Sequence, residues 1–252
     1  MKRSAALLLL IIFVEAVWAD AVSDAKAGLA AAQQGDDRTA VEYYSRVIES
    51  GEFSGHNLAV AYYNRGLSLQ RQGFHGEAID DYNQALQIAP NSPAIFYNRA
   101  IAHSEVGSYE AAVDDYDRFL AQHPDHVDAL NNRGFAQAML GQFEAAIVDY
   151  TRAIELNPKN AVVYNNRGDA YRAQGLLERA IADYSSAISI QPGYAKALFS
   201  RGLAHESKKN AQLAQQDFIA AYTLNPNNPV IKAKIDELKK NYLPYSVFQK
   251  PR

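Results

Sequence analysis

The chain has 252 residues, a net charge of -3 at pH 7, 48% hydrophobic residues and no cysteine. This apolar content argues against a disordered chain. The balanced charge, without a dense run of lysine or arginine, argues against a nucleic-acid-binding surface. Because cysteine is absent, the chain can form no disulfide or cysteine-ligated metal site and has no thiol nucleophile.

The first residues have the layout of a secretory signal peptide. Two basic residues at positions 2 and 3 precede an uninterrupted apolar run over residues 5–14. Small residues then fit a cleavage site after Ala19 or, alternatively, after Ala21. The apolar run is shorter than the ~20 residues that span a bilayer, which disfavours a membrane anchor. We therefore expect residues 1–19 to be removed and the rest to be exported, to the periplasm or outside the cell, without stable membrane insertion.

A spacing of 34 residues runs through the remainder of the chain. Four kinds of residue recur with this one period, which predicts tandem structural repeats. They are the arginines Arg65, Arg99, Arg133, Arg167 and Arg201, the alanines Ala78, Ala112, Ala146, Ala180 and Ala214, the aromatics Tyr82, Tyr116, Tyr150, Tyr184 and Phe218, and the prolines Pro90, Pro124, Pro158, Pro192 and Pro226.

Each unit reads as two helices joined by a turn. In residues 161–194, Tyr164 and Gly168 lie on one helical stripe, and Gly175 then interrupts the pattern. A second stripe contains the aromatic Tyr184, and a proline closes the unit. We expect the glycine of the first helix to allow a close helix crossing, with the aromatic ring filling the space beside it.

These features resemble the tetratricopeptide repeat (TPR) family, in its small residues, mid-unit glycine, second-helix aromatic and terminal proline. The resemblance implies an all-α fold, a right-handed α-solenoid of helix-turn-helix repeats, over nearly all of the chain after the signal. The last repeat departs from the pattern because Lys209 stands where the mid-unit glycine is expected. We predict a degenerate first repeat over 21–54, an insertion over 55–58, five regular repeats within 59–228 (59–92, 93–126, 127–160, 161–194 and 195–228), a capping helix over 229–241 and a tail over 242–252.

The predicted cap follows from the sequence after the last repeat. An asparagine and a proline at 228–229 suit the N-cap and the first helical position. Ile231, Ile235 and Leu238 then form one apolar edge. Such a helix would cover the apolar face that the final repeat of a solenoid otherwise exposes. The tail, 242–252, is expected to be loose or, alternatively, to dock on the molecule or on a neighbour.

An aspartate column accompanies the arginine column. Both lie on helical stripes that should face the packing between helices, and an unpaired buried charge is strongly penalised. We therefore predict a ladder of structural ion pairs, within or between repeats, although the arginines could instead bind an anionic ligand. The predicted partners of the five arginines are Asp81, Asp115, Asp149, Asp183 and Asp217.

The residue before each arginine forms another column, which reads asparagine four times and then Ser200. It lies about 100° around the helix from the arginine. In tetratricopeptide arrays this edge lines the concave face, and the column resembles the asparagine ladder with which O-linked N-acetylglucosamine transferases hold extended peptides. An amide can bond a peptide N–H and C=O together. The alternative is a tolerated polar residue on an exposed face.

We predict a peptide-binding groove around this column, apolar and aromatic in its earlier part and polar in its later part. A carboxylate clamp of the kind used by chaperone-binding repeats is disfavoured, because tyrosines and asparagines occupy the corresponding positions and Lys196 is isolated. The predicted groove residues are Tyr63, Asn64, Leu67, Tyr97, Asn98, Ile101, Asn131, Asn132, Phe135, Asn165, Asn166 and Asp169.

The sequence points to binding rather than catalysis. It has no phosphate-binding loop and no serine nucleophile elbow, and the one hint of a metal site, at 123–126, falls in a turn between repeats. We expect a non-enzymatic adaptor or scaffold for a protein or peptide partner, with no catalytic residue, metal or cofactor. The alternatives are a structural subunit that self-associates into a homo-oligomer or helps assemble an envelope complex and, third, a binder of glycans or small molecules.

Overall fold

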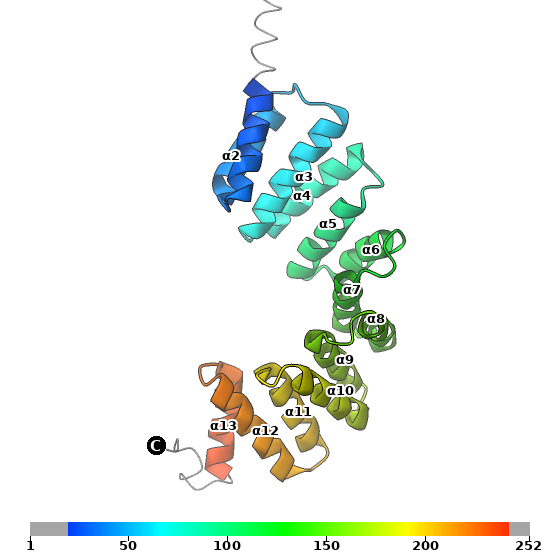
Figure 1. The fold of residues 1–252 in the computed structure, drawn as a ribbon, viewed down its shortest axis with the longest axis vertical. Helices are drawn as coiled ribbons and strands as arrows, with labels where there is room; N and C mark the ends of the chain where they lie inside the picture. Colours follow the sequence, from blue (N-terminus) through cyan, green and yellow to red (C-terminus); the bar gives the residue numbers. More distant parts are fainter. Residues whose placement is uncertain (1–19, 242–252) are drawn as a thin grey trace, which may run out of the picture. The chain divides into compact units, whose positions relative to one another are not determined.

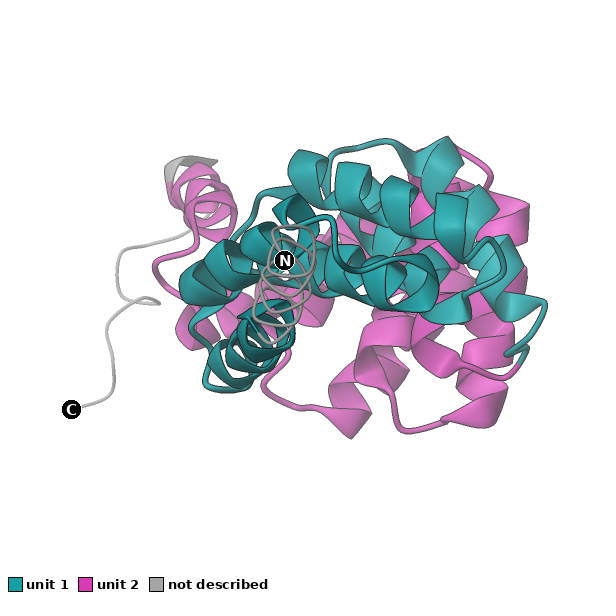
Figure 2. Ribbon diagram, turned by 90° about the horizontal axis from the view of Figure 1, so that it is seen from above, with its two compact units in different colours: residues 1–124 teal, residues 125–252 magenta. Residues whose placement is uncertain are grey.

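The computed structural model describes residues 20–241, so the predicted signal (1–19) and tail (242–252) lie outside the described part. Between residues 20 and 241 the chain forms helices joined by short turns, with no strand (Figure 1). The predicted all-α helical-repeat fold is thereby confirmed. The chain divides into two compact units after Pro124, shown in teal and magenta in Figure 2.

The N-terminal unit pairs its helices in chain order. Helices that follow one another in the sequence pack together, as in α3 with α4 and α5 with α6. The helix over residues 20–33 has no label in Figure 1. The labelled helices are α2 (Asp37–Glu49), α3 (Gly55–Arg71), α4 (His75–Ile88), α5 (Pro93–Glu105) and α6 (Tyr109–Leu120).

The C-terminal unit repeats the arrangement and ends in an additional helix. Within it, α9 contacts both α7 and α11, so the first helices of three successive repeats lie side by side. We call the surface formed by such first helices the groove face. The helices are α7 (Val127–Met139), α8 (Phe143–Leu156), α9 (Ala161–Ala173), α10 (Leu177–Ile190), α11 (Ala195–Ser207), α12 (Ala211–Leu224) and α13 (Pro229–Asn241).

The core of each repeat is the helix crossing expected from the glycine and aromatic columns. A Cβ atom built on Gly168 would lie 2.7 Å from Cε1 of Tyr184, so the ring occupies the space that any larger residue would need. Gly66, Gly134 and Gly202 face their aromatic partners in the same way. The five aromatic residues of the column are at most 1% exposed. The small residues therefore allow the two helices of each repeat to approach closely, and the aromatic ring fills the remaining space in the core.

The turns between paired helices need a left-handed backbone. In the turns of the earlier repeats, glycine supplies a positive φ without a side-chain clash, as at Gly175 with φ 76°. The last repeat uses Lys209, whose φ of 63° is the one positive value outside glycine among the described residues. A lysine in this conformation is strained, because its Cβ approaches the carbonyl that follows.

The predicted insertion, 55–58, forms the first turn of α3. As a result α3 has 17 residues, whereas the first helices of the later repeats, such as α9, have 13. The extra residues therefore lengthen the helix by about one turn. They place Asn57 on a turn that the other first helices do not have.

The helix α13 occupies the residues predicted for the cap. Asn228 Oδ1 accepts hydrogen bonds from the backbone N–H groups of Val230 and Ile231, at 3.0 and 3.1 Å. This satisfies two donors that a helix start otherwise leaves open. Ile235 is fully buried against Phe218 of α12. The cap is thus held by hydrogen bonds at its start and by apolar packing along one edge.

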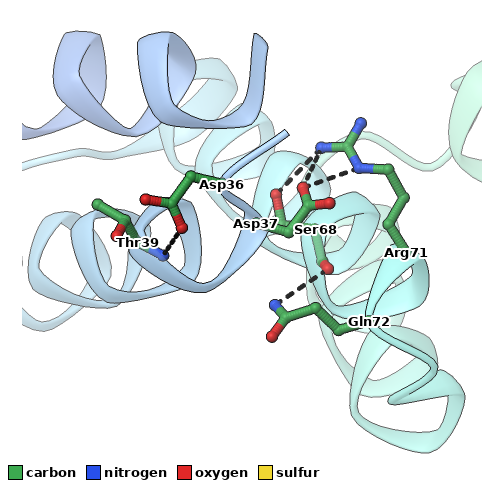
Figure 3. Close-up of polar contacts among 6 residues, drawn as sticks. All are labelled: Asp36, Asp37, Thr39, Ser68, Arg71 and Gln72. Carbon is green, nitrogen blue, oxygen red and sulfur yellow. Dashed lines mark hydrogen bonds and ion pairs between the residues drawn. The ribbon is translucent and has the colours of Figure 1, made fainter. Parts of the chain in front are cut away.

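Polar contacts join the first repeat to the second (Figure 3). Arg71, at the end of α3, reaches back to Asp37 at the start of α2, with Nε 2.8 Å and Nη2 2.7 Å from Asp37 Oδ1. Arg71 Nη2 also donates to Ser68 Oγ at 3.3 Å. The start of α2 is capped by Asp36, which accepts the backbone N–H of Thr39 at 3.1 Å.

Candidate functional site

The structure brings the arginine and aspartate columns together within each repeat. Arg167 donates from Nε and Nη2 to the two carboxylate oxygens of Asp183, both at 2.8 Å. Such a two-pronged contact is the strongest geometry available to this pair of residues. The other pairs have the same geometry at 2.6–2.8 Å: Arg65–Asp81, Arg99–Asp115, Arg133–Asp149 and Arg201–Asp217.

A third bond from the guanidinium reaches the preceding repeat. Nη1 of Arg167 donates to Thr151 Oγ1, on the second helix of the repeat before, at 3.0 Å. The same bond recurs from Arg65 to Ser45, from Arg99 to Asn83 and from Arg201 to Ser185. These arginines therefore hold the two helices of their own repeat and also the neighbouring repeat.

These bonds leave little of the arginine for a ligand. The side chain of Arg167 is 16% exposed and that of Asp183 is 8% exposed. The hydrogen bond to the aspartate raises the pKa of Arg167, and the same cause raises the pKa of Arg65. With its donors directed at protein acceptors, Arg167 acts as part of the scaffold, and the alternative of an anion-binding arginine finds no support in this geometry.

The asparagine column also connects neighbouring repeats, on the groove face. Asn98 Nδ2 donates to the hydroxyl of Tyr63 at 3.0 Å, and Asn166 Nδ2 donates to Asn131 Oδ1 at 3.0 Å. Each bond joins first helices of successive repeats. Asn98 Nδ2 also donates to the backbone oxygen of Ala94 at 2.8 Å, which uses its second N–H, but the amide oxygens of Asn98 and Asn166 remain as acceptors. The asparagines thus have a structural role and retain polar atoms for a partner.

In the N-terminal unit, all six predicted groove residues are partly buried. The ring of Tyr63 packs against that of Tyr82, with centroids 6.0 Å apart, and the ring of Tyr97 packs against that of Phe119 at 4.9 Å. Part of the apolar surface of each tyrosine is therefore buried against the core. The remaining members of the set are Asn64, Leu67, Asn98 and Ile101.

The C-terminal unit contains a groove of about 420 Å³ on its groove face. This volume lies in the range of sites that bind small ligands or several side chains of a peptide. Three of the predicted residues line it: Phe135, Asn166 and Asp169. The other lining residues are Ala138, Met139, Phe143, Tyr150, Ala170, Arg172, Lys196, Phe199, Ser200 and Leu203. We call the groove formed by these lining residues the unit-2 groove, after the C-terminal unit (unit 2 in Figure 2).

Asn165 is not a groove residue, which corrects the prediction. Its side chain is fully buried, and its Nδ2 donates to Asp169 Oδ2 at 3.0 Å. The corresponding positions of earlier repeats hold Tyr63 and Tyr97, whose longer side chains remain partly exposed. The short amide of Asn165 lies below the surface instead. Asn131 and Asn132 are partly buried and bond to each other at 3.2 Å, outside the lining of the groove.

Asp169 organises the polar wall of the unit-2 groove. Its Oδ1 accepts the hydroxyl proton of Tyr184 at 2.8 Å, while its Oδ2 accepts the bond from Asn165. Lys196 Nζ lies 3.8 Å from Oδ2, and the lysine side chain is 59% exposed. The carboxylate is therefore held in place by neutral donors, and the ammonium of Lys196 stands at the rim, available to a partner.

Several lining residues were missed by sequence reasoning. Phe199 and Leu203 follow the predicted groove columns into the last repeat, so extending those columns by one period would have found them. Phe143 and Tyr150 come from the second helix α8, and no groove column marks them. As a result the groove has an apolar wall in which Phe135, from the part predicted to be apolar, is joined by Phe199 and Leu203 from the last repeat, beyond the part predicted to be polar.

Within residues 20–241, no group of three or more histidine, aspartate or glutamate side chains is arranged to hold a metal ion. His126, in the turn that hinted at a metal site, caps α7 by accepting the backbone N–H of Ala129 at 3.2 Å. None of the helices in the described part of the chain is long and apolar enough to cross a membrane.

Comparison with protein families gives one consistent result. Six family models match, five described as tetratricopeptide repeat and one as TPR repeat. Together they cover residues 25–228 without a gap. The individual matches are 25–93, 65–131, 127–160, 149–182, 168–209 and 195–228. No curated protein matched the chain.

Solved structures resemble the chain in fold. A MamA structure is 29% identical with a TM-score of 0.60, covering 67% of this chain and 96% of that one. MamA from Desulfovibrio magneticus RS-1 is 24% identical with a TM-score of 0.63, covering 68% and 97%. YrrB, described as a TPR protein with an unusual peptide-binding site, is 21% identical with a TM-score of 0.62, covering 79% and 100%. With helix pairs in a 34-residue period and family matches along 25–228, the chain belongs to the tetratricopeptide repeat family.

Proposed function

We propose that the chain is a non-enzymatic interaction scaffold whose unit-2 groove binds a segment of a partner protein. The observation that carries this proposal is the composition of the groove wall. Met139 is 52% exposed and Phe135 is 43% exposed, and both lie in one groove with the amide of Asn166. Exposed apolar side chains beside directional polar groups are typical of surfaces that bind other proteins.

The partner segment would be extended and would carry at least one apolar side chain. That side chain packs among Phe135, Met139 and Phe199, where its burial supplies most of the affinity. The backbone of the segment runs beside Asn166, whose amide oxygen can accept a peptide N–H while its nitrogen keeps the bond to Asn131. The likeness in fold to YrrB, which is described as having a peptide-binding site, is consistent with this mode.

A photo-crosslinking experiment tests the proposal. A benzophenone amino acid replaces Met139 in the groove and, in a matched control, replaces Val148, which is 67% exposed on the second helix α8. We expect a crosslinked partner at position 139 and none at 148, with mass spectrometry locating the crosslink in one short segment. Equal crosslinking at both positions, or none at 139, would refute groove binding.

A second variant separates binding from folding. Replacing Phe199 by alanine removes apolar groove wall, together with the contact of its ring with that of Phe218, whose centroid lies 5.4 Å away. We expect crosslinking at position 139 to fall at least tenfold while the circular dichroism spectrum keeps its helical form. If crosslinking is unchanged, the apolar wall is not what holds the partner.

We also propose that the protein acts outside the cytoplasm. Support comes from the basic residues at positions 2 and 3 and the apolar run over residues 5–14, which have the form of a secretory signal. Mass spectrometry of the protein from the fraction outside the cytoplasm should give a mature N-terminus at Asp20 or Val22. An intact N-terminus in cytoplasmic protein would contradict export.

A further inference from the structure

The groove face of the N-terminal unit contains a separate apolar pocket of about 240 Å³. It lies between the helix over 20–33 and α3, with Phe53 from the α2–α3 turn as one wall. The volume is below the 300–1,000 Å³ typical of drug-sized ligands and suits one large side chain. The other lining residues are Val22, Ala25, Lys26, Leu29, Tyr44, Asn57, Val60, Ala61 and Asn64.

This pocket depends on features that the later repeats do not share. Asn57 belongs to the extra first turn of α3, and Phe53 precedes that turn. Leu29 and Val60, which are 48% and 39% exposed, stand at the positions that the charged Asp169 and Lys196 hold in the fifth and sixth repeats. Two groove regions of one chain therefore differ in chemistry: the unit-2 groove has a charged wall, and this pocket is apolar.

The hydroxyl of Tyr44 is the unusual polar group of the pocket. In two later repeats the equivalent hydroxyl has an acceptor on the first helix: Tyr82 donates to Gln70 at 2.7 Å and Tyr184 donates to Asp169 at 2.8 Å. Counting back the same 12 or 15 residues from Tyr44 reaches Ala32 and Leu29, which have no acceptor.

Tyr44 is only 2% exposed, and its hydroxyl makes no hydrogen bond. Burial raises its pKa, an effect that the nearby Asn64 side chain partly opposes without completing hydrogen-bond geometry. A buried hydroxyl without a partner loses its hydration and gains no hydrogen bond in return. The hydroxyl of Tyr44 is therefore a hydrogen-bond donor without an acceptor beside the pocket, and a carbonyl oxygen of a ligand could accept its bond.

Lys26 determines the charge that the pocket prefers. It is exposed and is the one charged residue among the described residues that line the pocket. The acid nearest in sequence, Asp24, is already paired with Arg46, at 3.0 Å. An ammonium at the rim of an apolar pocket favours a ligand with a carboxylate next to its apolar group.

We propose that this pocket is a second binding site, which takes a leucine- or phenylalanine-sized side chain of a peptide whose neighbouring residue is glutamate or aspartate. The apolar side chain enters between Leu29, Val60 and Phe53. The carboxylate meets Lys26 at the rim, and a backbone carbonyl oxygen of the peptide accepts the hydrogen bond from Tyr44. This site is independent of the unit-2 groove.

Two pools of fluorescein-labelled hexapeptides test the site on the mature full chain by fluorescence anisotropy. In one pool a fixed leucine or phenylalanine is followed by glutamate, and in the matched pool lysine replaces the glutamate. We expect the acidic pool to bind more tightly than the basic pool by at least fivefold. If neither pool binds, or if both bind equally, the proposal is wrong.

Four variants assign the binding to the pocket. Lys26→Glu should reverse the preference towards the basic pool, and Val60→Gln should abolish binding of both pools. Tyr44→Phe should weaken binding about fivefold, as expected for one hydrogen bond, without lowering the unfolding midpoint. Phe199→Ala, in the unit-2 groove, should leave the preference for the acidic pool unchanged. Loss of this preference in Phe199→Ala, with an unchanged acidic preference in Lys26→Glu, would overturn the proposal and place the peptides in the unit-2 groove.

Discussion

Replacing Asp183 by asparagine tests the role of the arginine ladder. The substitution keeps the size of the side chain but removes its charge and turns one acceptor into an N–H donor that faces the donors of Arg167. Both carboxylate contacts of Arg167 are 2.8 Å long, and Asp183 is 8% exposed. The guanidinium would remain largely buried, with Thr151 and at most one amide oxygen as its bonded partners.

The expected loss is about 3 kcal/mol of unfolding free energy. Breaking a buried ion pair by removing one partner costs about 3–5 kcal/mol. The lower end applies because Arg167 is 16% exposed and keeps its bond to Thr151. For a chain of this size each kcal/mol shifts the melting temperature by about 2–4 °C, so the expected decrease is roughly 6–12 °C.

The control is a surface pair of the same chemistry. Arg152 contacts Asp125 at 2.7 Å, but the two side chains are 47% and 61% exposed. Exposed pairs contribute little because water and salt screen them. The Asp125→Asn variant should therefore melt within error of the wild type.

Two measurements separate local from global loss. Circular dichroism at 222 nm follows melting, and hydrogen exchange locates where protection is lost, since repeat proteins can unfold in segments. We expect faster exchange in α9 and α10 of the Asp183→Asn variant. If this variant melts like Asp125→Asn and exchanges like the wild type, the ladder does not stabilise the fold and our reasoning fails.

Three further tests address the packing, the turns and the partly buried histidines. Gly168→Ala should destabilise the chain by about 1–3 kcal/mol, because the added methyl group overpacks against Tyr184. The higher helix propensity of alanine offsets about 1 kcal/mol of this loss. A urea midpoint above that of the wild type would contradict this expectation. Lys209→Gly should relieve the strain of the left-handed backbone and raise the unfolding free energy by about 1 kcal/mol. The matched variant Gly175→Lys should lower it. If both variants have the urea midpoint of the wild type, the left-handed backbone at these turns is not strained. Burial lowers the pKa of His103 and of His205, so the folded chain binds fewer protons than the unfolded chain. Stability should then fall as pH drops below the unfolded value of about 6.5, and the double variant with glutamine at both histidines should lose less melting temperature between pH 7.5 and 5.5; identical losses would refute this linkage.

The parts of the fold that sequence predicted are those in which one residue type keeps one partner. Each arginine meets an aspartate 16 positions later, so both appear as columns with the 34-residue period. The third bond of the arginines was invisible for the opposite reason. Its acceptors include Ser45, Asn83, Thr151 and Ser185, which hold one position of the repeat but differ in residue type, so no recurring letter marks them in the sequence.

The site was predicted less well than the scaffold because side-chain length decides exposure. Tyr97 and Asn165 occupy the same position in their repeats, yet the tyrosine is partly exposed and the asparagine is fully buried. A column identifies the face of a helix but not how far its side chains reach. Contributions from a second helix, such as Phe143, lie outside the column altogether.

The division between scaffold and site runs between adjacent residues of each first helix. Arg167 bonds to second helices, while its neighbour Asn166 bonds across the groove face to another first helix. Because the two side chains point about 100° apart, residues of the groove face can change without disturbing the ladder. The position of Asp169 shows this freedom, since the first repeat has Leu29 there. That exchange adds a carboxylate to the wall of one groove, and the first repeat, which also has Ala32 where the second repeat has Gln70, leaves the hydroxyl of Tyr44 without an acceptor. The residues of each groove region can therefore be suited to a different binding partner while the packing of the helix pairs stays the same.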